Sequence, residues 1–180
     1  MRSSVRVRPP RPDDGDEYIA LNRRSRAFHA GLASPPVDRT SYRRLLSRAE
    51  SPTYRYWLIE RRSDRAIVGA VELSQIALGN FRSAYLGYQI GAPFARRGYM
   101  REALEAVLTE ALGRLKLHRV EANIQPRNVS SIRLVKGLSF RREGLSRRYL
   151  KVGGRWRDHE RWALLAEDWR TFCRMRGEPG

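Results

Sequence analysis

The sequence has almost no cysteine and no long apolar run. Its single cysteine, Cys173, excludes an intrachain disulfide framework and a metal site built from a cysteine cluster, so we expect no metal. No stretch approaches the roughly 18 consecutive apolar residues that would cross a bilayer. Residues 1–12 carry charge with no apolar stretch behind them, which is unlike a secretory signal. We therefore expect a soluble, cytoplasmic protein that does not associate with a membrane.

Acidic residues are also scarce. The chain has 19 Asp and Glu against 36 Lys and Arg, which gives a net charge of +17. Only Lys116, Lys136 and Lys151 are lysines, so arginine supplies nearly all of the positive charge. This charge favours an anionic partner such as nucleic acid, nucleotide phosphates or an RNA-rich particle. It is equally consistent with an arginine-rich composition spread over a solvated surface.

The length and the apolar content indicate one folded unit. The chain has 180 residues, of which 41% are hydrophobic, and it contains no internal repeat or low-complexity linker. A chain of this size can bury a sizeable core. We expect a single domain over residues 1–180, with a core at about 5–169 and a tail at 170–180.

Hydrophobic periodicity predicts an α/β (α+β) chain with a mixed sheet. A Gly-Gly pair at 153–154 between two apolar-rich runs predicts a hairpin. The predicted strands are 5–8, 54–59, 66–73, 84–90, 119–124, 145–152 and 155–165. The predicted helices are about 13–28, a short one capped by Asp38 or Thr40, a long one over 99–115 and a short one around 131–135.

The loop before the longest predicted helix has the features of an anion site. Residues 91–100 lead into the helix N-terminus, where unpaired N–H groups and the helix dipole attract negative charge. Gly98 removes a side chain where a phosphate would approach, and Arg96 and Arg97 add positive charge. Without further context, an ordinary strand-to-helix loop with a surface arginine pair explains the same residues.

A second polar segment follows the strand predicted at 119–124. Pro126 ends that strand, Asn128 fits the N-cap of the next helix, and Ser131 falls in the first turn. Helix capping alone explains this pattern, and ligand binding is the alternative.

Taken together and in order, these motifs resemble the Rim-type branch of the GNAT acetyltransferases, which includes the N-terminal acetyltransferases of ribosomal proteins. Gly98 with the loop before it resembles the acetyl-CoA pyrophosphate loop of that superfamily. The resemblance covers about residues 5–169 and is densest over 68–164. Its other motifs are Tyr-Leu-Gly-Tyr-Gln-Ile-Gly at 85–91, His-Arg-Val-Glu-Ala-Asn at 118–123, Pro126, Asn128, Ser131, Phe140 and Trp-Arg-Asp-His at 156–159.

The resemblance implies the GNAT fold and acetyl-CoA as co-substrate. In that fold a sheet of about seven strands, flanked by about four helices, splays between its fourth and fifth strands, here about 84–90 and 119–124. Asn128 would contact the pantetheine arm, and Ser131 would reach the sulfur and stabilise or protonate the departing thiolate. The residues expected to bind the cofactor are Gln89, Ile90, Gly91, Ala95, Arg96, Arg97, Gly98, Tyr99, Met100, Asn123, Asn128 and Ser131.

The chain departs from the family pattern at three positions. Ala95 stands where the family usually has Gln or Arg, and Ser139 replaces the Gly that precedes Phe140. Arg148 stands before Tyr149, where some relatives carry an acidic residue that is credited as the general base. An arginine does not accept a proton at neutral pH, so the base is not carried over.

The expected reaction is direct acetyl transfer to an amine through a tetrahedral intermediate. A backbone N–H near Ile90 is the expected oxyanion donor. The candidate bases are Glu121, Glu72 and Asp158, and Glu121 ranks first because its strand borders the splay. An α-amine has a pKa of about 8, so a weak base suffices.

The acceptor is left open by the sequence. The favoured acceptor is the N-terminal amine of a ribosomal or other basic protein. The alternatives are a small amine, or a non-catalytic module that binds RNA or the ribosome through the +17 charge. We expect either a monomer or a homodimer.

Overall fold

The computed structural model describes residues 3–177. The strands are β1 (Val5–Arg8), β2 (Arg55–Arg61), β3 (Ile67–Ala77), β4 (Ser83–Ile90), β5 (Arg119–Ile124), β6 (Arg141–Val152) and β7 (Arg155–Leu165). The helices are α1 (Gly15–Arg24), α2 (Arg39–Ala49), α3 (Tyr99–Leu108), α4 (Val129–Lys136) and α5 (Ala166–Met175). Short 3-10 turns occupy Pro12–Asp14 and Ala92–Phe94, and a π-helical segment follows α3 at Thr109–Arg114.

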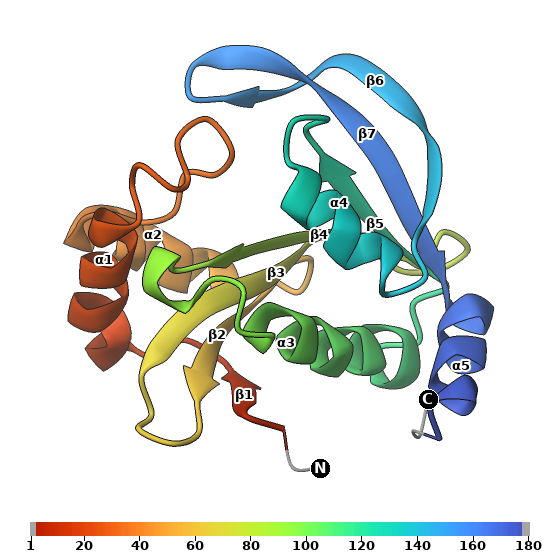
Figure 1. Cartoon of the computed structure of the whole chain (residues 1–180), viewed down its shortest axis with the longest axis horizontal. Helices are drawn as coiled ribbons and strands as arrows, with labels where there is room; N and C mark the ends of the chain where they lie inside the picture. The colour runs from red at the N-terminus through yellow and green to blue at the C-terminus, as the bar shows by residue number, and fades with distance from the viewer. Residues whose placement is uncertain (1–2, 178–180) are drawn as a thin grey trace.

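The seven strands form one mixed sheet in the order β1-β2-β3-β4-β5-β7-β6. Every neighbouring pair is antiparallel except β4 and β5, which are parallel and are joined by the crossover through α3. In Figure 1, α1 and α2 lie at one side of the sheet, α3 and α4 lie in front of it, and the long β6–β7 hairpin arches over the top. The predicted mixed α/β sheet of seven strands is confirmed.

The two halves of the sheet touch only briefly. The parallel ladder between β4 and β5 consists of three residue pairs, Ser83 with Arg119, Ala84 with Val120 and Tyr85 with Glu121. Beyond Tyr85 the two strands diverge, although β4 continues to Ile90 and β5 to Ile124. The predicted splay between the fourth and fifth strands is therefore confirmed, and we call the space between them the notch.

Apolar clusters on the two faces of the sheet hold the helices in place. One cluster joins α1 and α2 to β2 and β3 through Tyr18, Tyr42 and Leu58. The larger cluster packs α3, α4 and α5 on the sheet. Burial at about 25 cal/mol per Å² of apolar surface makes such clusters the main stabilising contribution. The helices that flank the notch are thus fixed by packing on opposite faces.

The structure differs from the predicted elements in two places near the edge of this core. The helix predicted to run to residue 115 is α-helical only to Leu108, and the Leu115 N–H then bonds the Glu110 carbonyl at 2.9 Å, five residues back. A fifth helix, α5, was not predicted. It buries Trp169 and Cys173, so the expected start of a tail at residue 170 falls inside a helix that packs on the core.

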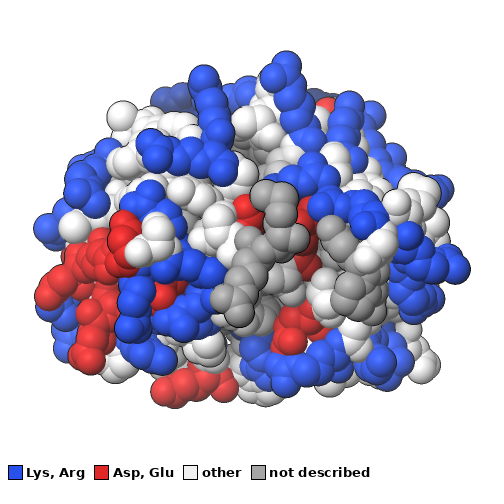
Figure 2. Space-filling model, turned by 60° about the horizontal axis from the view of Figure 1, so that its bottom comes forward, with Lys and Arg blue, Asp and Glu red and all other residues white. Residues whose placement is uncertain are grey.

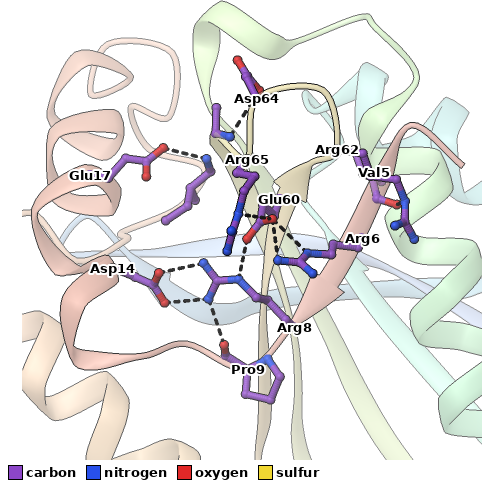
Figure 3. A network of polar contacts seen from close by, with 12 residues as sticks. Val5, Arg6, Arg8, Pro9, Asp14, Glu17, Glu60, Arg62, Asp64 and Arg65 are labelled. Carbon is purple, nitrogen blue, oxygen red and sulfur yellow. Dashed lines mark hydrogen bonds and ion pairs between the residues drawn. The ribbon is translucent and has the colours of Figure 1, made fainter.

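A buried carboxylate fastens the first strand to the second (Figure 3). The Glu60 side chain is 2% exposed, and its oxygens lie 2.7 Å from nitrogens of Arg6 and Arg8. Arg8 also pairs with Asp14 at 2.7 Å. Burial alone would raise the pKa of Glu60, but its hydrogen bonds and ion pairs with Arg8 and Arg6 outweigh burial and hold that pKa below its ordinary value.

Two further findings concern the described residues alone. None of their helices is both long enough and apolar enough to cross a membrane. Within the same residues, no three His, Cys, Asp or Glu side chains gather in a way that would hold a metal ion.

Candidate functional site

The open edge of β4 presents backbone N–H groups to the notch. The Gly91 N–H bonds the Val68 carbonyl at 2.8 Å, on the side of β3. In an antiparallel ladder, successive residues direct their backbone groups to alternate edges. Tyr88 and Ile90 therefore direct theirs toward β5, which has already diverged. The Ile90 carbonyl receives a hydrogen bond from Nε2 of His29 at 2.8 Å, and the Ile90 N–H is directed to the same edge.

The loop before α3 has the geometry of an anion site. Gly98 has φ of +83°, and a Cβ placed on it would meet nothing within 4 Å. The left-handed backbone, rather than local crowding, therefore favours glycine here. No side chain caps the N-terminus of α3, so its first N–H groups are available to a ligand. Arg96 and Arg97 are both exposed beside it.

Asn128 caps α4 as predicted. Its Oδ1 accepts a hydrogen bond from the Ser131 backbone N–H at 3.3 Å. The Ser131 hydroxyl is also engaged, because it shares a short hydrogen bond with the hydroxyl of Tyr88 across the notch. Burial raises the pKa of Tyr88 to about 12, so its phenol stays protonated at neutral pH. Ser131 thus has both a capping contact and a side-chain partner at the notch.

Asn123 has a side-chain hydrogen-bond acceptor without a partner on the β5 side of the notch. It lies on β5, and its Oδ1 is buried without a hydrogen-bond partner. A buried polar atom without a partner costs about 1–3 kcal/mol, and such atoms in native proteins call for an explanation. A ligand N–H in the notch would satisfy it.

The notch opens into a cavity of about 640 Å³ under the loop between α1 and α2. This is the volume range of sites for small molecules. Strands β2 to β5 form its floor, and the loop over 32–36, α2 and the β6–β7 hairpin form its walls. The residues from the predicted site that line it are Gln89, Asn123, Asn128 and Ser131, together with the candidate base Glu72.

Glu72 is the one acidic side chain among the residues that line this cavity. It lies opposite Gly87 on β4, and a Cβ on Gly87 would come within 2.7 Å of its Oε1. Glycine at that position therefore makes room for the carboxylate. Tyr54 donates a short hydrogen bond to Oε2 of Glu72. Burial and the neighbouring Glu72 both raise the pKa of Tyr54, which keeps the phenol as the donor.

Two arginines of α2 also line the cavity. The guanidinium of Arg48 lies over the ring of Tyr54, with its carbon 4.0 Å from the ring centroid, a cation–π arrangement. Arg44 lies one helical turn before it. Neither guanidinium has an ion pair with a carboxylate among the residues that the structure describes. The cavity thus contains two cations beside a single carboxylate.

The other two candidate bases are engaged elsewhere. Glu121 pairs with Nε of Arg119 at 2.9 Å and is absent from the cavity wall. Asp158 is exposed, and its Oδ1 accepts the backbone N–H of Arg148 at 2.7 Å. Arg148 itself has φ of +46°. The structure therefore brings Glu72 to the cavity but does not bring Glu121 or Asp158 there.

Three residues at the site had no predicted role. They are Tyr88, His29 and Tyr54, which contact Ser131, Ile90 and Glu72 respectively. The first two contacts join segments that are far apart in the sequence, so spacing gave no signal for them. The third joins the consecutive strands β2 and β3, whose pairing places Tyr54 next to the residues opposite Glu72. His159 also lines the cavity beside Tyr149, and burial lowers its pKa, which favours the neutral imidazole.

Comparison with known proteins decides the family. The chain matches the family described as "Acetyltransferase (GNAT) domain" over residues 4–141. The chain belongs to the GNAT acetyltransferase family. It is 31% identical over 176 residues to the probable N-acetyltransferase YjcK of Bacillus subtilis, covering 92% of this chain and 96% of that protein. It is 38% identical over 106 residues to the ribosomal protein uS5 alanine N-acetyltransferase of Escherichia coli, covering 59% and 55%.

Solved GNAT structures agree with this fold. Mycobacterium smegmatis RimJ in complex with CoA-disulfide superposes with a TM-score of 0.85 at 28% identity, covering 97% of this chain and 90% of that one. A spermidine N-acetyltransferase from Vibrio cholerae, in complex with CoA and spermine, superposes with a TM-score of 0.80 at 20% identity, covering 93% and 99%. The second likeness shows the fold alone.

The GNAT chain is therefore an acetyl-CoA-dependent N-acetyltransferase that transfers acetyl to an amine. Its notch fits the co-substrate. The open edge of β4 offers N–H groups, the uncapped start of α3 suits a pyrophosphate, and the unpaired oxygen of Asn123 lacks a donor that an amide chain would supply. No group of metal-ligating side chains is needed for this fit.

Proposed function

We propose that this GNAT enzyme acetylates the N-terminal amine of a protein, and that Glu72 receives the amine. The observation that carries the proposal is the charge of the cavity, in which Arg44 and Arg48 accompany a single carboxylate. A polyamine would bring several ammonium groups against these two guanidiniums. Unit charges 4 Å apart near a protein surface interact by about 4 kcal/mol, so a polycation is disfavoured there.

A peptide N-terminus suits the same surroundings. It brings one ammonium group for Glu72 and a row of carbonyl oxygens for the guanidiniums of Arg44 and Arg48. A basic ribosomal protein keeps its positive side chains farther along the chain, outside a cavity of about 640 Å³. The relative from Escherichia coli that is named for a ribosomal-protein alanine supports this acceptor class.

In the proposed mechanism each group of the chain has a separate task. Acetyl-CoA supplies an activated acetyl group when bound. Glu72 orients the amine and takes its proton, directly or through water. The N–H of Ile90 stabilises the developing oxyanion. Ser131, held by the protonated phenol of Tyr88, donates a hydrogen bond to the departing sulfur.

The proposed acceptor is tested by mass spectrometry of the reaction products. The purified protein is incubated with acetyl-CoA and either a peptide that begins with Ala or spermidine, and the products are identified by intact mass. We expect acetylation of the peptide α-amine and at least tenfold slower acetylation of spermidine. Faster turnover of spermidine would overturn the peptide as acceptor but would leave acetyl transfer intact.

A charge reversal on α2 sharpens the test. Arg48→Glu replaces a cavity cation by a carboxylate and should shift the preference toward spermidine. Arg43→Glu makes the same change on the same helix, but Arg43 does not line the cavity. If both variants shift the preference equally, the selection arises from overall charge and the proposed role of Arg48 is wrong.

A further inference from the structure

The tip of the β6–β7 hairpin has an unusual run of cations. Figure 1 shows the hairpin arching away from the rest of the sheet. Between Glu143 and Asp158 the chain has no carboxylate and five cations. These are Arg147, Arg148, Lys151, Arg155 and Arg157. We call residues 147–157 the hairpin tip.

The cations of the hairpin tip differ from those at the hairpin base in their partners. At the base, Arg141 pairs with Asp168 at 3.1 Å and Arg142 with Glu160 at 3.3 Å. At the tip, none of the five side chains forms an ion pair with a described residue, and four of the five residues are exposed. Their charge is therefore available to a partner, whereas the charge at the base is neutralised within the fold.

An exposed indole lies among these cations. Trp156 is 61% exposed, whereas Trp57, Trp162 and Trp169 are all buried. Lys151 is the cross-strand partner of Trp156. A large aromatic surface held in water next to cations is the arrangement that stacks nucleic-acid bases and binds their phosphates.

The backbone of the hairpin tip has a defined conformation, with a tight turn and a β-bulge. Gly153 and Gly154 have φ of +57° and +78°, as a tight two-residue hairpin turn requires. The register shifts between Ser146 and Leu150, so three residues of β6 lie opposite one of β7. Such a bulge bends a hairpin and changes the direction of its side chains. Arg148 sits in this bulge with φ of +46°.

The surface elsewhere is more mixed. Figure 2 shows a face of the molecule on which basic side chains are spread widely and acidic side chains gather in clusters. There the two signs partly offset one another. The net charge of +17 therefore does not by itself define a binding site, whereas the hairpin tip combines an exposed indole with cations that form no ion pair with a described residue.

We propose that the hairpin tip is a binding site for single-stranded RNA, with Trp156 stacking on a base and its neighbouring cations contacting phosphates. An acidic protein would use the cations but would not need the exposed indole. A second copy of the chain would place the same five cations against each other, because a two-fold contact repeats one surface. Tyr149, Leu150 and Val152 of the hairpin tip line the cavity, but Trp156 and the cations do not, so the proposed RNA contacts do not depend on the acceptor of the acetyl group.

The test measures binding of the full chain to a fluorescein-labelled oligouridine of about 12 nucleotides by anisotropy over a range of salt. Trp156→Ala should raise Kd by about 5- to 150-fold, which is the range for losing one stacked base, and should leave the salt slope unchanged. Trp156→Phe keeps a ring and should retain most of the affinity.

Removing cations should have a different signature. The double variant Lys151→Gln with Arg155→Gln should reduce the salt slope by about 1.4 and raise Kd about tenfold at near-physiological salt. The control loses the same charge at distant exposed positions, as Arg24→Gln with Arg170→Gln, and should bind nearly as the native protein does. Thermal melting checks that each variant is folded.

Two outcomes would overturn the proposal. In one, Trp156→Ala binds the oligonucleotide as tightly as the native chain. In the other, the control double variant loses as much affinity as the hairpin double variant, which would mean that diffuse charge binds RNA. A change of oligomeric state in Trp156→Ala with unchanged RNA affinity would assign the surface to contacts between copies instead.

Discussion

Nε2 of His29 lies 2.8 Å from the carbonyl oxygen of Ile90. This contact ties the loop after α1 to the edge of β4 that faces the notch, which has no neighbouring strand here, while β3 holds the opposite edge. The Ile90–Gly91 peptide is thus held at both ends, by His29 at its carbonyl and by the Val68 carbonyl at its N–H. The N–H of Ile90 belongs to the preceding peptide and faces the notch. An imidazole 61 residues away in sequence therefore helps to hold the peptide next to the proposed oxyanion donor.

Replacing that imidazole should slow the chemistry. We expect His29→Ala to lower kcat about tenfold, less than the roughly hundredfold or greater loss seen when an oxyanion donor is removed outright. His29→Gln retains a donor and should recover part of the rate. Steady-state kinetics measure the effect, and a melt shows whether the protein is folded. Equal rates for the Ala variant and the native enzyme would contradict this role.

Tyr88 and Ser131 should act as one unit. Ser131→Ala and Tyr88→Phe each remove one partner of their shared hydrogen bond, and each should lower kcat by about tenfold or more without changing acetyl-CoA affinity. Because the partners are coupled, the double variant should be hardly slower than either single variant. Additive losses would show that the two hydroxyls work independently.

The loop before α3 is tested by adding charge at Gly98. Gly98→Glu places a carboxylate against the pyrophosphate and should weaken acetyl-CoA binding in calorimetry. Gly98→Ala is the matched control, because both variants meet the same strain at φ of +83°. We expect the Glu variant to bind at least tenfold more weakly than the Ala variant. Similar affinities would remove the pyrophosphate from this loop.

Glu60 should make the free energy of unfolding depend on pH. Its folded pKa lies below the ordinary value, so its stabilising contribution is present above about pH 4.5 and is lost as the pH falls through the folded pKa. Glu60→Gln should lower the free energy of unfolding by about 2–4 kcal/mol at neutral pH, because it leaves Arg6 and Arg8 without their buried partner. Urea unfolding should show this difference shrinking in acid. A constant difference would mean that the carboxylate's charge is immaterial.

Ser139 is held in a conformation that suits glycine. Its φ is +66°, and the left-handed region costs an L-residue about 1–2 kcal/mol. Ser139→Gly removes that strain but increases the conformational entropy of the unfolded chain. We therefore expect the free energy of unfolding, measured in urea, to rise by about 0.5–1 kcal/mol. Destabilisation would show that the serine side chain contributes more than its backbone strain costs.

Local patterns predicted the elements around the site well. The strand at 119–124 has the predicted bounds, Asn128 caps α4, and the Gly-Gly turn joins β6 and β7. In each of these cases the determining interaction lies within a few residues. The departure at Ser139 was also visible in the sequence, and the structure shows that the helix end keeps the left-handed backbone without glycine.

Contacts between distant segments account for part of what was missed, and local signals that were not used account for the rest. The partnership of Tyr88 with Ser131 depends on how α4 packs across the notch, which no spacing encodes. The pairing of Glu121 with Arg119 could have been predicted from the sequence, since residues two apart share a face of a strand. The helix α5 had a signal too, in acidic residues at 167–168 followed by Trp169 and Cys173 at helical spacing. The π-helical segment Thr109–Arg114 changes the hydrogen bonding over six residues but keeps Ala111 and Leu112 buried, so the apolar pattern gave no sign of it.

The brief ladder between β4 and β5 has a consequence for what holds the two halves of the sheet together. Because three residue pairs alone join β4 to β5, the two halves are held together mainly by the buried apolar cluster that β3, β4, β5 and α3 share across the seam. Acetyl-CoA bound in the notch as proposed would contact both sides of this seam. Occupancy then stabilises the folded form by mass action, by about 2.7 kcal/mol at a hundred times Kd. The concentration of acetyl-CoA thus contributes to how stably the two halves of the sheet are held together.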